Sequence, residues 1–95
     1  MHALLDDYLD VLHFERGLSE QTRAHYQRDI AWLIEQHGPE LAAITPQHLR
    51  RSISQLHSQG MHGRSIARML SSWRGFFRYL VLQHGFAANP VLGLR

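Results

Sequence analysis

The sequence predicts an all-α fold in a single domain. Apolar residues recur at steps of three and four along the chain, and no stretch alternates apolar and polar residues as a half-buried strand would. The helical spacing breaks off at glycine or proline, which end helices. With 95 residues, of which 44% are apolar, the chain can bury one modest core.

The expected helices are delimited by residues that favour helix ends. Gly17 stops the first helix, Ser19 is placed to cap the second, and Gly38-Pro39 ends it. Thr45 precedes a proline at the first position of the third helix, which is a common start. We expect the main helices at about residues 3–16, 20–37, 46–59 and 64–84, with residues 86–94 as a tail.

The predicted core draws on one side of each helix, where apolar residues share a face. Its members are Leu5, Tyr8, Leu9 and Leu12, then Tyr26, Ile30, Leu33 and Ile34, then Leu49, Ile53 and Leu56, and finally Ile66, Met69, Leu70, Trp73, Phe77 and Leu80. The fourth helix is the longest and contributes more of them than any other helix.

Charge is divided unevenly along the chain. All eight carboxylates lie at or before Glu40 together with three arginines, which gives that segment a net charge of −5. The remaining residues carry seven arginines and no acid, a net charge of +7. An uncompensated positive charge of this size favours a polyanionic partner, most often nucleic acid. The alternative is a basic face that meets only solvent.

The best candidate for binding is a polar stripe on the predicted fourth helix. Its members recur at steps of three and four, apart from the apolar side: Arg64, Arg68, Ser71, Ser72, Gly75 and Arg78. Such a face can approach a DNA groove closely, with arginines reaching phosphates or guanines and serines reaching phosphates. Glycine in mid-helix costs up to about 1 kcal/mol of helix propensity. Its presence therefore indicates close backbone packing or a ligand.

The start of the second helix offers another set of polar residues. Thr22, Arg23, His25 and Arg28 lie near its positive end, where a hydroxyl and an arginine can anchor a phosphate. Thr22 can equally belong to the hydrogen bonds that Ser19 makes as the helix cap. Both possibilities stay open on the sequence.

No set of residues predicts catalysis, a metal site or a cofactor. The chain has no cysteine, and its eight histidines show no metal-binding spacing. His13, His37, His57 and His84 fall in the last turns of expected helices, where a cationic side chain favours the helix dipole. The three tyrosines lie in mid-helix, so packing is their expected role. We expect no enzyme activity from this chain.

The chain shows no targeting segment. Its longest apolar run is far too short to span a bilayer, and the first residues turn acidic without a basic leader. We therefore expect a cytoplasmic protein.

Three segments carry a recognisable pattern. Residues 14–29 (FERGLSEQTRAHYQRD) follow the form ER-LS-x-T-xxx-Y-xx-D, residues 65–80 (SIARMLSSWRGFFRYL) follow a long helix pattern, and residues 89–94 (NPVLGL) follow NP-xx-GL. In this order they resemble the N-terminal domain of tyrosine recombinases, over essentially the whole chain. Within that family the chain is most similar to the bacterial Xer recombinases, on the XerC side. Phage integrases share much of the pattern and remain an alternative.

This resemblance implies a SAM-like bundle of four or five helices in crossed hairpins, with the second and fourth helices facing the major groove of double-stranded DNA. The residues that it places closest to DNA are Thr22, Arg23, His25, Arg64, Ser65, Arg68 and Ser72. It makes residues 1–89 the core-binding domain and residues 90–95 the start of a linker. The acidic first helix is expected to face away from phosphates and towards a neighbouring subunit.

The resemblance also implies what lies outside the chain. The family's catalytic residues belong to a separate C-terminal domain, so we expect this chain to be an excised or truncated part of a longer protein. That protein is expected to break and rejoin DNA through a covalent phosphotyrosine, without a nucleotide cofactor. The Xer likeness implies chromosome-dimer resolution at cell division, with a second, XerD-like recombinase as partner in a synaptic tetramer.

Two other classes of protein remain compatible with the sequence. A helix-turn-helix regulator would use the third and fourth helices, although a fourth helix of about 20 residues is long for a recognition helix. A helical protein-interaction module would bind an acidic partner through its basic face. Salt-dependent DNA binding separates a DNA clamp from the interaction module. A clamp with about three to five phosphate contacts gives a log–log slope near −3 to −4, whereas the module gives none.

Overall fold

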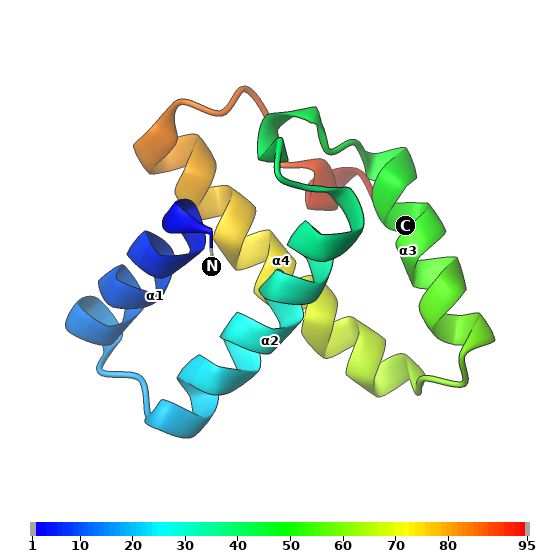
Figure 1. Ribbon diagram of the computed structural model, residues 1–95, viewed down its shortest axis with the longest axis horizontal. Coiled ribbons are helices and arrows are strands. Elements are labelled where there is room, and N and C mark those ends of the chain that lie inside the picture. Colours follow the sequence, from blue (N-terminus) through cyan, green and yellow to red (C-terminus); the bar gives the residue numbers. More distant parts are fainter. Residues whose placement is uncertain (1, 95) are drawn as a thin grey trace.

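The computed structural model describes residues 2–94, and within that range the chain is all-α (Figure 1). The predicted fold class is therefore confirmed. The elements are α1 (Ala3–Arg16), α2 (Glu20–His37), the 3₁₀-helix η1 (Leu41–Ala43), α3 (Pro46–Ser58), α4 (Gly63–His84) and the 3₁₀-helix η2 (Pro90–Gly93). Each α-helix begins and ends within about two residues of its predicted limits, which is the usual uncertainty of helix ends.

The helix ends follow from local chemistry. Gly17 adopts the left-handed conformation after α1, with φ 59°, which glycine reaches without a steric penalty. The Ser19 hydroxyl accepts a hydrogen bond of 3.2 Å from the backbone N–H of Thr22 and caps α2. Thr45 and His48 form a reciprocal capping box at the start of α3, ahead of Pro46 at its first position.

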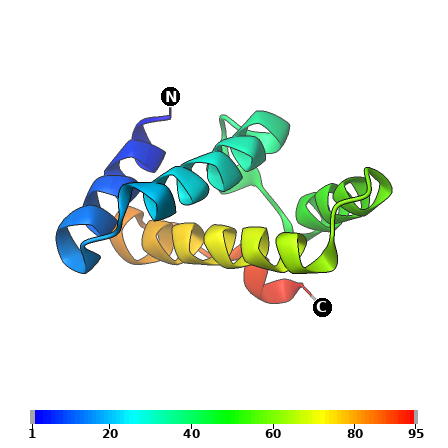
Figure 2. The same ribbon diagram turned by 90° about the horizontal axis from the view of Figure 1, so that it is seen from below.

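The helices form two hairpins, α1–α2 and α3–α4, which cross each other. Figure 2 shows α1 and α2 on one side of α4, with η2 on the other side and α3 beside the N-terminal half of α4. The crossing of α2 over α4 is the most extensive contact between elements. This arrangement leaves the N-terminal halves of α2 and α4 diverging from their crossing point, as the arms of a V (Figure 1).

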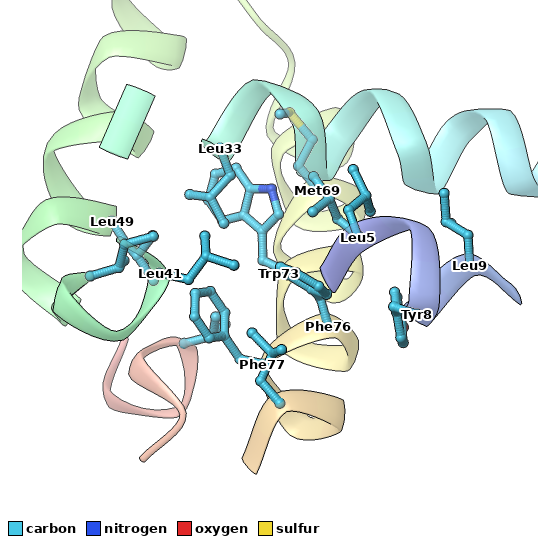
Figure 3. Packing of buried hydrophobic residues seen from close by; sticks show 14 of the residues in the cluster. Leu5, Tyr8, Leu9, Leu33, Leu41, Leu49, Met69, Trp73, Phe76 and Phe77 are labelled. Atoms are coloured by element: carbon cyan, nitrogen blue, oxygen red, sulfur yellow. The ribbon is translucent and has the colours of Figure 1, made fainter. Parts of the chain in front are cut away.

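The core is built around α4. Figure 3 shows Trp73, Phe76 and Phe77 between side chains from the other helices, and all three are fully buried. Burying a side chain of this size stabilises a fold by about 1.5–3 kcal/mol. Phe76 was not among the predicted core residues. Four residues that were predicted as core are only half-buried and pack at its edge: Tyr26, Ile34, Ile53 and Leu70.

The end of the described chain packs against the bundle. The Asn89 side chain accepts a hydrogen bond of 3.1 Å from the N–H of Val91 and donates one of 3.2 Å to the carbonyl of Arg74. Pro90 and Val91 are buried, and η2 contacts both α3 and α4. These residues were expected to begin a linker, and the position of that linker stays a prediction.

No helix within residues 2–94 combines the length and the apolar character that crossing a bilayer would require.

Candidate nucleic-acid interface

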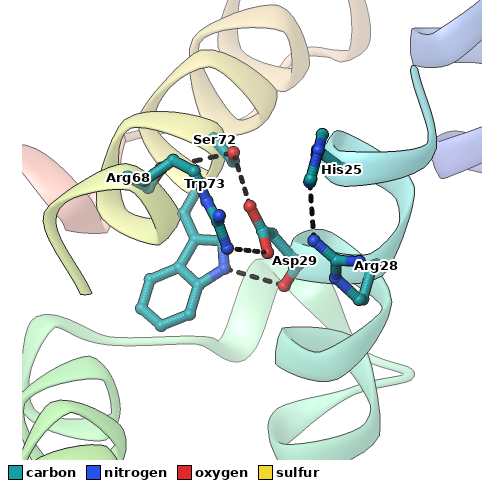
Figure 4. A network of polar contacts seen from close by, with 6 residues as sticks. All are labelled: His25, Arg28, Asp29, Arg68, Ser72 and Trp73. Carbon is teal, nitrogen blue, oxygen red and sulfur yellow. Dashed lines mark hydrogen bonds and ion pairs between the residues drawn. The ribbon is translucent and has the colours of Figure 1, made fainter. Parts of the chain in front are cut away.

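One buried carboxylate fixes the point where α2 crosses α4. Asp29 of α2 is 2% exposed and has partners at three atoms (Figure 4). Its Oδ1 lies 3.4 Å from Nη2 of Arg68, and its Oδ2 accepts a hydrogen bond of 3.1 Å from the Ser72 hydroxyl. Its backbone carbonyl accepts a hydrogen bond of 2.9 Å from Nε1 of Trp73. Burying a charge is costly unless it is paired and hydrogen-bonded, so these contacts specify one crossing geometry.

Aromatic packing supports the same crossing. The rings of Trp32 and Trp73 stack with their centroids 6.0 Å apart and their planes 4° from parallel. Trp73 thereby uses its ring for packing and its N–H for a hydrogen bond, as buried tryptophans usually do. The mutual orientation of the diverging N-terminal halves is therefore held by both polar and apolar contacts.

The prediction that Ser72 lies closest to DNA does not agree with the structure. The side chain of Ser72 is 2% exposed, and its hydroxyl is committed to Asp29, so it has no access to a phosphate. The reason is its place at the border of the polar stripe nearest α2, where a small residue lets the two helices approach.

Close packing also explains why the polar stripe of α4 contains a glycine, Gly75. A Cβ atom there would lie 2.7 Å from the hydroxyl oxygen of Tyr8 on α1. Of the two explanations that the sequence left open for this glycine, the structure bears out backbone packing rather than a ligand.

The N-terminal half of α4 keeps its arginines at the surface. Arg64 is exposed, and no carboxylate of the described residues forms an ion pair with it. The side chain of Arg68 is 49% exposed although one of its nitrogens pairs with Asp29. Ser65 is half-buried beside them. The two guanidinium groups therefore present free N–H donors along this arm of the V.

The predicted residues of α2 divide into two groups. Thr22 belongs to the cap of α2, because its hydroxyl oxygen accepts a hydrogen bond of 3.0 Å from the Ser19 hydroxyl. Arg23 turns towards α1, where its guanidinium lies 3.3 Å from a carboxylate oxygen of Asp10. His25 instead lies on the side of α2 that faces Arg68, as Figure 4 shows.

Two residues of this site, Arg28 and Asp29, are not among those that the resemblance places closest to DNA, although Arg28 belongs to the polar set noted at the start of the second helix. Arg28 is exposed and contacts His25, with 2.6 Å between their nitrogens, which makes it the cationic partner of that ring on α2. Asp29 was counted only as a charge. A signal for its role existed, since helical spacing places it on the same side as Tyr26 and Leu33, where a carboxylate needs a buried partner.

The resulting surface is cationic. His25, Arg28, Arg64 and Arg68 lie on the two diverging arms, while the negative charge of Asp29 is buried and paired beneath them. Within residues 2–94, no group of three or more histidine, aspartate or glutamate side chains is arranged to hold a metal ion. The exposed guanidinium groups of the two arms suit the binding of an anion.

Fold and surface define a small, all-α, SAM-like domain. The chain belongs to the family described as "Phage integrase, N-terminal SAM-like domain", which it matches over residues 5–84. This membership sets aside the helix-turn-helix regulator. No solved structure matches the chain.

The most similar relatives are named as recombinases. The chain is 46% identical to Tyrosine recombinase XerC 1 of Ralstonia nicotianae, over 99% of the chain and 30% of that protein. It is 38% identical to Tyrosine recombinase XerC of Xylella fastidiosa, over 100% of the chain and 34% of that protein. It is 40% identical to Tyrosine recombinase XerD of Pseudomonas putida, over 96% of the chain and 32% of that protein. The chain thus spans about a third of the length of these relatives.

Proposed function

We propose that this chain is the DNA-binding half-clamp of a tyrosine recombinase, and that the N-terminal halves of α2 and α4 face the major groove of double-stranded DNA. The observation that carries the proposal is the cationic V: two helical arms held apart at Asp29, with three arginines and His25 on their surface. Arginine is suited to this role because its planar group donates to phosphate oxygens and to guanine edges.

Each arm has a defined part in the proposed complex. Arg64 lies in the first turn of α4, where no side chain caps the helix, so backbone N–H groups and a guanidinium can meet the same phosphate. Arg68 lies one turn further along. Arg28 and His25 supply the donors of the α2 arm. Of the residues that the resemblance places closest to DNA, we retain His25, Arg64, Ser65 and Arg68 and leave Thr22, Arg23 and Ser72 in structural roles. We add Arg28 from the polar set at the start of α2.

For the parent protein, we propose DNA strand breakage and rejoining through a phosphotyrosine formed by a separate domain, not by this chain. The XerC names among the relatives favour chromosome-dimer resolution in the cytoplasm. A second, XerD-like recombinase is the partner that fits this role. A phage-type integrase is the alternative within the same family.

An NMR titration of the chain with a short DNA duplex at low salt tests the proposed interface. We expect amide shifts concentrated at residues 22–28 and 63–69. Arg64→Ala should weaken binding and reduce the log–log salt slope by about 1, the loss expected for one phosphate contact. Arg68→Ala is a poor probe, because it leaves the buried carboxylate of Asp29 unpaired.

The matched control is Arg50→Ala on α3, which removes one exposed arginine away from the V. It should leave both the affinity and the salt slope close to those of the parent chain. Shifts centred on α1, or equal losses for Arg64→Ala and Arg50→Ala, would overturn the proposed interface.

A further inference from the structure

A second basic surface lies on the other half of α4. A groove of about 690 Å³ is lined by residues of α1 and of the C-terminal half of α4. Figure 1 shows these two segments side by side. Val11, Leu12 and Leu82 give the groove an apolar lining, and Arg16, Arg74 and Arg78 line it as well. The candidate DNA-binding residues occupy the opposite half of α4, so the two surfaces share a helix without sharing side chains.

The arginines of this groove are not neutralised within the fold. Among residues 2–94, the ion pairs are those of Arg23 with Asp10 and of Arg68 with Asp29, and neither involves the groove. Glu15 is the single carboxylate among the lining residues. The polar groups of Tyr79 and His84 are hydrogen-bonded to each other at 2.9 Å. The groove therefore keeps a net positive charge that calls for acidic groups on a partner.

The apolar part of the groove decides between two kinds of acidic partner. Leu82 is 66% exposed, and it lines the same groove as Val11 and Leu12. A DNA backbone would satisfy the arginines but would leave these apolar side chains against charged phosphates. An amphipathic helix with carboxylates on one side and apolar residues on the other satisfies both. The lining residues of α4 run from Ser71 to His84, which matches about four turns of a partner helix.

We propose that this groove binds an acidic amphipathic helix of a partner protein. Carboxylates of that helix pair with Arg16, Arg74 and Arg78, and its apolar side covers Leu82 and the residues beside it. This interaction is separate from the proposed DNA binding. The chain can hold both partners at once, because they use opposite halves of α4.

A designed peptide tests the proposal directly. The probe is an acetylated and amidated helical peptide of about 14 residues, with leucine along one side and glutamate along the other, and it is titrated into the 15N-labelled chain. We expect amide shifts at residues 8–16 and 71–84. The double variant Arg74→Glu, Arg78→Glu should weaken binding at least about tenfold, and Leu82→Ser should weaken it about threefold or more.

The control double variant is Arg50→Glu, Arg51→Glu, which makes the same change in net charge on the exposed side of α3. It should change the affinity for the peptide less than about twofold, because it lies outside the groove. The substituted arginines and Leu82 are all exposed, so the variants should fold, which thermal unfolding checks. The control pair also loses the surface hydrogen bond of 3.2 Å that Arg50 donates to the Gly93 carbonyl.

Four results would overturn the proposal. Equal losses in the two double variants would show that net charge alone attracts the peptide. Equal binding of a peptide with the same composition in scrambled order would show that no amphipathic face is recognised. Displacement of the peptide by a DNA duplex, with shifts in the groove, would assign the groove to DNA. Self-association of the chain that Arg74→Glu, Arg78→Glu abolishes would assign it to a second copy.

Discussion

At the scale of single residues, Asp29 and Gly75 set how α4 meets its neighbours. Asp29 satisfies a guanidinium, a hydroxyl and an indole N–H from three residues of α4. Gly75 lets the Tyr8 hydroxyl approach the helix backbone more closely than any Cβ would allow. One polar contact and one missing methyl group thus position α2 and α1 on the same helix.

Removal of the Asp29 carboxylate should destabilise the fold more than removal of its hydroxyl partner. Asp29→Ala leaves the Ser72 hydroxyl without its carboxylate partner and the Arg68 guanidinium without its counter-charge, and we expect a loss of about 2–3 kcal/mol in the free energy of unfolding. Ser72→Ala removes one hydrogen bond and should cost about 1 kcal/mol. Urea unfolding measures both. Equal effects would mean that the ion pair with Arg68 contributes nothing.

A methyl group at position 75 should be harmful only while the Tyr8 hydroxyl is present. Alanine gains about 1 kcal/mol of helix propensity over glycine, but its Cβ would lie 2.7 Å from that oxygen. Overpacking of this kind costs about 1–3 kcal/mol, so Gly75→Ala should be neutral to destabilising by about 2 kcal/mol. Burial, and then the neighbouring Tyr26, raise the pKa of Tyr8 to about 12, so the hydroxyl stays neutral in this contact.

The double variant Tyr8→Phe, Gly75→Ala tests that explanation. With the oxygen gone, Gly75→Ala should stabilise the Tyr8→Phe protein by up to about 1 kcal/mol. A penalty that persists without the hydroxyl would place the steric conflict elsewhere on α1.

At the scale of elements, local chemistry determined the helix ends, whereas the faces of α4 depended on its neighbours. Capping involves residues only a few positions apart, so the sequence alone reveals these helix ends. They are marked by Gly17, Ser19 and the Thr45-Pro46 pair. Which side of α4 is covered depends on where α1 and α2 cross it. Ser72 was therefore predicted to be exposed and proved buried.

The candidate site was likewise predictable only where it depends on residues within a single helix. The arginine arm of α4 followed from charge and helical spacing, since both are properties of the sequence alone. The α2 arm was predicted less well. Arg23 turns to α1 because Asp10 lies within reach there, a contact 13 residues away in sequence that spacing along one helix cannot reveal.

The junction between α2 and α3 should weaken in acid. His37 in the last turn of α2 is hydrogen-bonded to the buried Ser52 hydroxyl of α3, and its ring stacks on His48 with centroids 5.3 Å apart. Burial, and then the positive charges of His48 and Arg51, lower the pKa of His37 below the usual value of 6.5.

A lowered histidine pKa means that the unfolded chain takes up a proton that the folded chain resists. The stabilising contribution is therefore fully present above about pH 6.5 and is lost as the pH falls from there through the folded-state pKa. Urea unfolding between about pH 8 and pH 5 should show this decline, and His37→Gln should flatten it. His13→Gln, at an exposed position on α1, is the control. An unchanged slope in His37→Gln would contradict the assignment.

At the scale of the whole molecule, the packed unit extends into residues that were expected to be linker. Val91 is 3% exposed, and Asn89 ties the start of η2 to the backbone of α4. The same short segment lies against the side of α4 that faces away from α1 and α2 (Figure 2), and it also contacts α3. The domain is therefore closed at this side by its last described residues.

Truncation after Asn89 should lower the free energy of unfolding by about 2–3 kcal/mol, chiefly through the lost burial of Val91 and Pro90. A chain that ends at Leu94 is the control and should match the full sequence. Thermal and urea unfolding compare the three. Equal stability after truncation would restore residue 89 as the end of the domain.

The position of Arg68 has a consequence for anyone who wishes to redesign the DNA preference of this domain. Its guanidinium spans a buried carboxylate on one side and the surface of the V on the other. An exchange that seeks a new base contact at this position also withdraws the counter-ion of Asp29, so each gain in selectivity would be accompanied by a lower melting temperature. Libraries that vary Arg68 alone would thus recover mostly poorly folded proteins. Libraries that vary Arg68 together with Asp29 allow the DNA preference to change without the loss of stability.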